Sequence, residues 1–167
     1  RLIATLAHPL NQAEFASESN TLVAGYTVLQ PRVEIKLTGE NQSRFAQIFA
    51  GDTGLDLYTL AVSDVYQDLF GEGIYAGKGI YDVAAFERSL AGRVPDNALL
   101  SHDLFEGIHG RVGLVTDVVL HEDYPSHLVH YTLRLRRWVR GDWQLLPWLL
   151  PKTPRVTGKL MPNLQSV

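Results

Sequence analysis

Residues 99–120, LLSHDLFEGIHGRVGLVTDVVL, indicate the fold class. An apolar start leads into a short helix that Ser101 or Asp103 can cap. Residues 113–120, GLVTDVVL, predict a strand because β-branched side chains dominate them. Helices that alternate with strands are typical of layered α/β proteins. We therefore predict a fold of this class.

The same alternation continues towards the N-terminus. Residues 22–37 are predicted to be extended, with Pro31 kept out of a central ladder position because it has no N–H. An apolar stripe at helical spacing over residues 58–69 predicts a helix that Asp56 can cap and Gly71 can end. Residues 1–7 fit either the end of a helix or a strand, and the pattern leaves their type open.

Caps and breakers assign the remaining segments. Glycines interrupt residues 71–81, which predicts extended chain where a backbone closely approaches another group. Asp82 can cap a helix over residues 83–90, and residues 127–143 predict an Arg-rich helix. Regular structure is expected to end near three prolines, Pro147, Pro151 and Pro154.

Length and composition limit the classes of protein. The chain has 167 residues, a formal net charge of −3 and 46% hydrophobic residues. We expect one domain or part of one, over residues 1–150, and an irregular, Pro-rich tail over residues 151–167. The acidic balance argues against nucleic acid as a partner. The sequence has no Cys, which excludes disulfides and thiolate sites, and no apolar run reaches the roughly 20 residues of a membrane span.

Asp103 is the first candidate for catalysis. A carboxylate at a helix start is kept ionised by the helix dipole and the free amides, as a general base requires. The alternative is that Ser101 and Asp103 only cap the helix. Ser101, His102 and Asp103 do not form a hydrolase triad, because adjacent residues point in different directions.

A second candidate is the basic run RLRRWVRGDWQ, residues 134–144. At helical spacing Arg134, Arg137 and Trp138 share a face, so two guanidinium groups and an indole ring could grip a diphosphate and stack on a ring. The alternative is a solvated basic face beside a core tryptophan. Lys78 lies between Gly77 and Gly79 and could reach a phosphate, although the rest of a P-loop pattern is missing.

Four segments carry a resemblance to a known family: GYTVLQPRVEI (residues 25–35), AVSDVYQDLFGEGIYAGKGIYDVAAFE (61–87), LLSHDLFEG (99–107) and RRWVRGDWQLLPW (136–148). They resemble the glycosyltransferase domain of cyclic β-1,2-glucan synthases. Those are very large bacterial enzymes of the inner membrane that use UDP-glucose and carry a GT-A-type domain. The resemblance implies the C-terminal, acceptor-side portion of such a domain, with a mixed sheet, flanking helices and the cytoplasmic face of the membrane as its location.

The resemblance also implies roles for individual residues. Asp103 stands where processive synthases place the general base that deprotonates the acceptor hydroxyl. His102, next to it, is implied to bind the substrate. Three residues stand where those enzymes have a Gln-x-x-Arg-Trp motif that holds the diphosphate and the acceptor end: Arg134, Arg137 and Trp138. Arg134 departs from the usual Gln. Lys78 falls on the acceptor-side strand. The implied partners are UDP-glucose and a β-1,2-glucan acceptor, and the implied reaction inverts the anomeric carbon.

One expected feature of the family is missing. GT-A enzymes use an Asp-x-Asp motif to bind Mg²⁺ or Mn²⁺ with the diphosphate, and this sequence contains no Asp-x-Asp. By resemblance the motif would precede Arg1, which is not Met, so we expect a piece of a longer enzyme. The piece alone is expected to be inactive. No metal ligands are predicted within it.

Two other functions stay open at this point. A glycoside hydrolase or phosphorylase could pair Asp103 with Glu106, but residues three apart on a helix rarely frame opposite faces of a sugar. A non-catalytic carbohydrate or nucleotide-sugar binding module could use aromatic platforms, namely Trp138, Trp143 and Tyr81. Residues 145–150, LLPWLL, fit either a membrane interface or a buried packing segment.

Overall fold

The computed structural model describes residues 1–50, 65–99, 102–150, 152–156 and 160–162. These residues form a mixed α/β fold, as predicted. The helices are α1 (Leu2–Leu6), η1 (Pro9–Asn11), α2 (Leu37–Glu40), α3 (Arg44–Phe49), α4 (Val65–Phe70), α5 (Val83–Leu90), α6 (Asp103–Gly110), α7 (Leu128–Gln144) and η2 (Leu146–Leu149). The strands are β1 (Glu14–Phe15), β2 (Leu22–Ala24), β3 (Val28–Ile35), β4 (Ile80–Tyr81), β5 (Val112–Glu122), β6 (Lys152–Pro154) and β7 (Leu160–Pro162).

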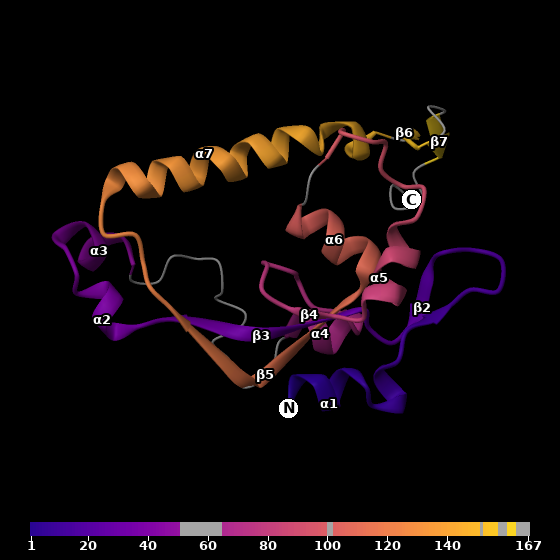
Figure 1. Cartoon of the computed structure of the whole chain (residues 1–167), viewed down its shortest axis with the longest axis horizontal. Coiled ribbons are helices and arrows are strands. Elements are labelled where there is room, and N and C mark those ends of the chain that lie inside the picture. Colours follow the sequence, from indigo (N-terminus) through magenta and orange to yellow (C-terminus); the bar gives the residue numbers. More distant parts are fainter. Residues whose placement is uncertain (51–64, 100–101, 151, 157–159, 163–167) are drawn as a thin grey trace.

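A three-stranded mixed sheet in the order β4-β3-β5 lies at the centre. Strand β3 pairs antiparallel with β4 and parallel with β5. Figure 1 shows α5 and α6 on one side of this sheet, α1 on the other, and α7 crossing beyond α6. The helix α6 therefore lies between the sheet and α7, so its side chains can contact both.

Pro31 lies in the middle strand, although the sequence analysis kept it out of a central position. The antiparallel partner β4 reaches only Val28 and Leu29, so at Pro31 only β5 pairs with β3. The register between β3 and β5 shifts directly after Pro31. Pro31 has no N–H to donate, but no strand pairs with β3 on the β4 side at this position, so no ladder hydrogen bond is lost there. The rule that proline avoids a position with ladder bonds on both sides therefore holds at Pro31.

Two glutamine side chains extend the edges of the sheet where no strand pairs. Gln30 Nε2 donates to the carbonyl of Ile74 at 3.2 Å, and its Oε1 accepts from the backbone N–H of Ala76 at 2.7 Å. Gln67 makes the same pair of bonds with Leu114, at 3.1 and 2.5 Å. The side-chain amides thus take the place of a neighbouring strand's peptide groups.

We expect Gln30→Leu to lower the free energy of unfolding by about 1–3 kcal/mol, because it removes two part-buried hydrogen bonds to the backbone of Ile74 and Ala76, each worth about 0.5–1.5 kcal/mol. The matched control is Gln42→Leu at an exposed position. Urea unfolding followed by circular dichroism measures both. Equal midpoints for the two variants would show that Gln30 does not hold the 74–76 segment.

The buried residues form two small clusters. The first joins Val28, Tyr75 and Val112 at the sheet centre, and the second joins Ala46, Ala50 and Tyr124 beside α3. Gly79 allows the first cluster to close, since a Cβ there would lie 2.6 Å from Val28 Cγ1. The predicted close approach of a backbone in the glycine-rich segment is confirmed at this position.

The predicted helices are confirmed where the structure describes them. Asp82 caps α5, accepting from the N–H of Ala85 at 3.0 Å. Gly71 follows α4 with φ +69, while Asp56 lies outside the described residues. His102, not Asp103, is the N-cap position of α6 and makes no side-chain cap bond; Ser101 also lies outside the described residues.

Both ends of the chain add detail to the prediction. Residues 2–6 form the short helix α1, which settles the open choice there. In the tail expected to be irregular, β6 and β7 pair antiparallel, with Thr153 opposite Met161. Proline does not prevent this pairing, because Pro154 is the last residue of β6 and Pro162 the last residue of β7. Proline is tolerated at the ends of edge strands, where its missing N–H removes no interior ladder hydrogen bond.

Candidate functional site

Asp103 lies against the glycine turn that precedes β4. Gly77 has φ +89, and a Cβ there would lie 3.1 Å from Asp103 Oδ2. Gly107 lets α6 pack closely on the same segment, since its Cβ would lie 2.9 Å from the Cβ of Tyr75. The structure therefore brings together two of the predicted positions, Asp103 and the turn that carries Lys78.

The helix start was predicted to keep the Asp103 carboxylate ionised, but the surroundings of this side chain raise its pKa instead. Burial raises the pKa of this carboxyl first, and the negative charge of Glu106 raises it further. His102 and Lys78 act in the opposite direction and do not cancel the shift. A carboxylate with a raised pKa is a stronger base than an ordinary Asp, which suits proton abstraction from a hydroxyl.

Two tyrosine hydroxyls form a hydrogen-bonded chain that ends on Glu106. Tyr75 and Tyr81 are hydrogen-bonded to each other, and the Tyr81 hydroxyl donates to Glu106 Oε2 at 3.4 Å. Burial is the main reason that the pKa values of both phenols are raised, so both remain protonated near neutral pH. Tyr75 was missed at the sequence level, although its place between glycines pointed to close packing.

His102 connects α6 to α7. Its Nε2 lies 3.0 Å from Asp142 Oδ1, and a Cβ at Gly141 would lie 2.9 Å from His102 Cδ2. An ionised carboxylate only accepts, so Nε2 carries the hydrogen and, in the neutral ring, Nδ1 is an acceptor. This Nδ1 is buried and has no hydrogen-bond partner in the part of the chain that the structure describes.

The predicted basic site lies on α7. The Arg134 guanidinium stacks on the Trp138 ring at 4.7 Å, and Trp138 is 37% exposed. Trp138 precedes Gly141 by three residues and shares its side of the helix, so it lies about 5 Å along the axis from the His102 contact. Arg137 is exposed at the edge of this face, and Arg136 is exposed on the opposite one.

Lys78 differs from its predicted role. Its backbone is left-handed, with φ 67, and its ammonium pairs with Glu122 at the end of β5. The sequence analysis missed Glu122, because nothing in the pattern shows that the glycine turn meets the far end of this strand. Lys78 is thus already paired, and it affects Asp103 only by lowering its pKa.

The chain offers no cation site in its described part. No group of three or more His, Cys, Asp or Glu side chains there could hold a metal ion. The whole sequence also lacks Asp-x-Asp. The described residues therefore do not by themselves provide ligands for the Mg²⁺ or Mn²⁺ that the resemblance implies.

Most of the chain is similar in sequence to part of a known protein. No family model matches the chain. The chain is similar to a segment of a glucan synthase. That protein is the cyclic beta-(1,2)-glucan synthase NdvB of Rhizobium meliloti (strain 1021), with 48% identity over 150 residues. The matched region is 89% of this chain, but the chain spans only 5% of the length of that relative.

Proposed function

We propose that this segment is the acceptor-side part of an inverting, GT-A-type glucosyltransferase that extends a β-1,2-glucan from UDP-glucose. The main support is the position of Asp103, a carboxyl of raised pKa set between a glycine turn and the His102 bridge to α7. The similarity to a glucan synthase supports the choice of reaction. The activity belongs to a longer protein, called here the full-length synthase.

Each step can be assigned to a side chain of this segment. An Asp103 carboxylate oxygen accepts the proton of an acceptor hydroxyl as that oxygen forms a bond to C1 of glucose. The bond from C1 to the UDP oxygen breaks, and UDP leaves with the electron pair from the opposite face, so C1 inverts. Arg134 and Arg137 hold the diphosphate oxygens by charged hydrogen bonds, and Trp138 stacks on a sugar ring.

The remaining predicted residues have supporting roles in this proposal. His102 is placed at the substrate in this proposal, and Asp142 fixes its ring through Nε2. Lys78 stays on Glu122 and positions the turn beneath Asp103. A divalent cation, Mg²⁺ or Mn²⁺, would neutralise the diphosphate when bound. Its ligands are not among the described residues, so no step is assigned to it.

The experiment for the reaction uses UDP-glucose labelled in the sugar. Full-length synthase should release UDP in step with the appearance of label in β-1,2-linked glucan. Release of UDP with label appearing as free glucose would indicate hydrolysis and contradict transfer. Asp103 and Glu106 lie one turn apart on α6, which agrees poorly with the opposed carboxylates of a hydrolase.

A second candidate is a non-catalytic binding module. The observation in its favour is the exposure of two indoles, 37% for Trp138 and 70% for Trp143. Calorimetry of the 167-residue chain with UDP, with and without Mn²⁺, tests for binding by the segment alone. This candidate would be favoured if the chain binds UDP with the same affinity in the presence and in the absence of Mn²⁺, and if the Asp103→Asn synthase remains active.

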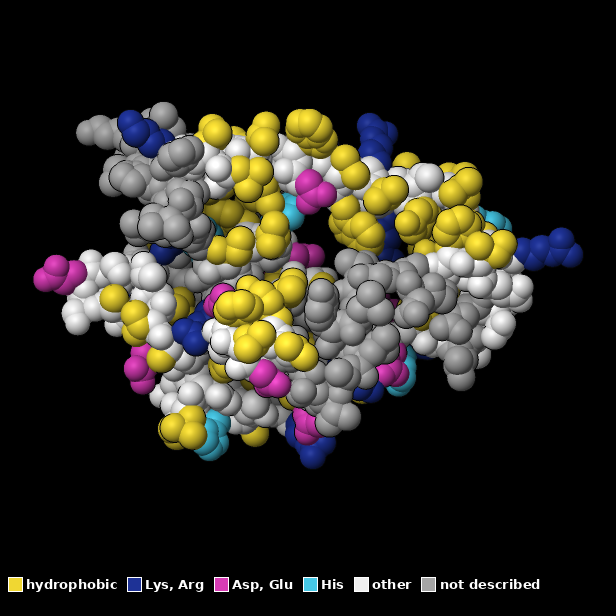
Figure 2. Space-filling model, turned by 180° about the vertical axis from the view of Figure 1, so that it is seen from behind, with side chains coloured by type: hydrophobic (Ala, Val, Ile, Leu, Met, Phe, Trp, Pro, Cys, Tyr) yellow, Lys and Arg dark blue, Asp and Glu magenta, His cyan; other side chains and the backbone are white. Residues whose placement is uncertain are grey.

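We also propose that α7 and η2 lie on the cytoplasmic surface of the inner membrane in the full-length synthase. The outward side of α7 exposes apolar residues, and Figure 2 shows hydrophobic side chains along this edge of the molecule. They are Leu128, Leu135, Val139 and Trp143, continued in η2 by Leu146 and Leu149. Arg136 and Arg140 flank them, as expected for a helix on an anionic surface. No helix in the described residues is long and apolar enough to span a membrane.

Trp143 should move into lipid while Trp148 does not. Trp148 packs on Phe105, with ring centroids 5.4 Å apart, whereas Trp143 is exposed. Two variants that each keep one of these tryptophans, with the other two changed to Phe, are mixed with anionic vesicles. We expect reduced acrylamide quenching for Trp143 only. Unchanged quenching of Trp143 would contradict membrane contact by this face.

A further inference from the structure

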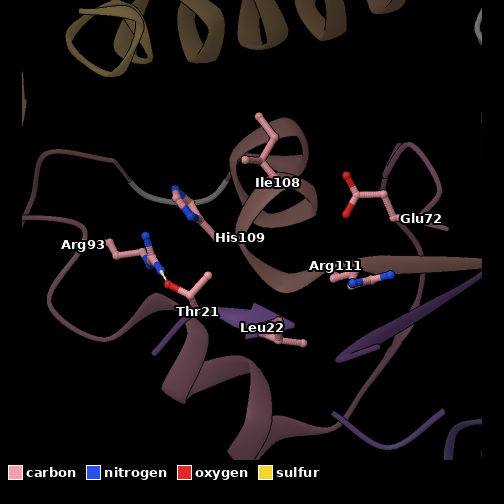
Figure 3. A pocket seen from close by; sticks show the side chains of 7 residues that line it. All are labelled: Thr21, Leu22, Glu72, Arg93, Ile108, His109 and Arg111. Atoms are coloured by element: carbon pink, nitrogen blue, oxygen red, sulfur yellow. Dashed lines mark hydrogen bonds between the residues drawn. The ribbon is translucent and has the colours of Figure 1, made fainter. Parts of the chain in front are cut away.

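A small cavity lies at the opposite end of α6 from Asp103. It has a volume of about 160 Å³ and is lined by Thr21, Leu22, Glu72, Arg93, Ile108, His109 and Arg111. Figure 3 shows Arg93 and His109 on one side of it and Arg111 and Glu72 on the other. The volume is well below the roughly 300 Å³ at which sites for drug-sized ligands begin. A nucleotide sugar is therefore too large for it.

Two guanidinium groups of the cavity are held by neutral groups. Arg93 Nε donates to the Ser89 carbonyl at 2.7 Å, and Arg111 donates to the carbonyls of Val23 and Gly71 at 3.1 and 3.2 Å. Neither forms an ion pair with an acidic side chain among the described residues. Their positive charges are therefore fixed in place without being neutralised.

Arg111 is also held in an unusual conformation. It follows α6 with φ 48, a left-handed value that side-chain-bearing residues seldom adopt. Its Nε is buried and has no hydrogen-bond partner among the described atoms. A buried charged donor without a partner is costly, so the Arg111 guanidinium lies at the cavity wall without full hydrogen bonding.

The pKa of His109 indicates an excess of positive charge around the cavity. Burial and, to a smaller extent, the charges of Arg93 and Arg155 together lower the pKa of this imidazole to about 3. The ring is therefore neutral near pH 7. Arg155, which follows β6, thus adds a third cation near the cavity.

We propose that this cavity binds a phosphate group, either free or as the monoester end of a small molecule, between Arg93, His109 and Arg111. Guanidinium groups match the oxygens of phosphate in pairs, and the cavity has room for an anion of a few heavy atoms. Glu72 is the opposing charge on the wall and repels the anion, so it lowers the affinity without removing the net attraction.

The experiment titrates the 167-residue chain with inorganic phosphate and, separately, with methyl phosphate at constant ionic strength. Saturable binding by calorimetry should be accompanied by changes in the His109 imidazole resonances in the NMR spectrum of the unmodified chain. Binding of inorganic phosphate alone identifies the free ion as the ligand, and binding of both identifies a site that also takes monoesters. Absence of saturable binding of either would overturn the proposal.

Variants test the position of the bound anion. Arg93→Lys and Arg111→Lys keep the charge but lose the paired donors, and each should weaken binding at least about tenfold. Glu72→Gln should strengthen it. The control is Arg136→Gln on α7, which should leave phosphate affinity unchanged. If Arg136→Gln weakens binding as much as the lysine variants, or if bound phosphate leaves His109 unperturbed, the anion lies elsewhere and the proposal fails.

Discussion

Asp103→Asn in the full-length synthase is expected to reduce glucosyl transfer by about 100-fold or more, with the affinity for UDP nearly unchanged. Asn keeps the shape of the side chain but cannot accept a proton, and a positioned general base is worth roughly 10² to 10⁴ in rate. The side chain lies against Gly77 and makes no diphosphate contact in the proposed mechanism. Transfer rate and UDP affinity are measured on the same preparation. A rate above about one hundredth of the unmodified enzyme would contradict the role of Asp103.

Glu106→Gln is the matched control, one turn further along α6. It should keep most of the activity and move the acid limb of the pH–rate profile. The base works only when ionised, so activity falls as the pH drops through the pKa of Asp103. Because the charge of Glu106 raises that pKa, its removal should shift the loss of activity to lower pH. An unchanged profile would show that another group titrates.

Arg137→Ala should lower kcat/KM for UDP-glucose by about 10- to 150-fold, the effect of losing a charged hydrogen bond of about 1.5–3 kcal/mol. Arg137→Lys should recover little of this loss, because a point charge does not replace two parallel donors. The exposed position of Arg137, beside the face where Arg134 stacks on Trp138, leaves its guanidinium accessible to a ligand.

Arg136→Ala is the control for the charge of α7, since Arg136 is exposed on the opposite face. It should change kcat/KM only slightly at fixed salt and Mg²⁺ concentration. Equal losses for the two alanine variants, or full recovery with Lys at position 137, would indicate a diffuse basic patch. A clamp for the diphosphate would then be the wrong interpretation.

The sequence predicted the elements whose signals are local. β-branched content located β5, and Asp82 located the start of α5, because caps and strand propensities act over a few residues. Helical spacing placed Arg134 and Trp138 together, and the structure shows them stacked. The GT-A assignment and the roles of the site residues remain predictions.

Contacts between distant segments could not be predicted in the same way. The pairing of Lys78 with Glu122 depends on how β5 runs beside β3, and the bonds from Gln30 to the 74–76 segment depend on where β4 stops. The Asp142 contact of His102 requires α7 to cross α6 at Gly141. Each of these is set by the packing of whole elements, which a local pattern does not encode.

Photolabelling tests the position of the site without any mutation. A UDP-glucose analogue with a diazirine on the glucose ring is bound to full-length synthase, irradiated, and mapped by peptide sequencing. We predict label in residues 102–107 or 134–138, and loss of that label in excess UDP-glucose. Label found only outside this 167-residue segment, and still displaced by UDP-glucose, would contradict the claim that these residues line the transfer site.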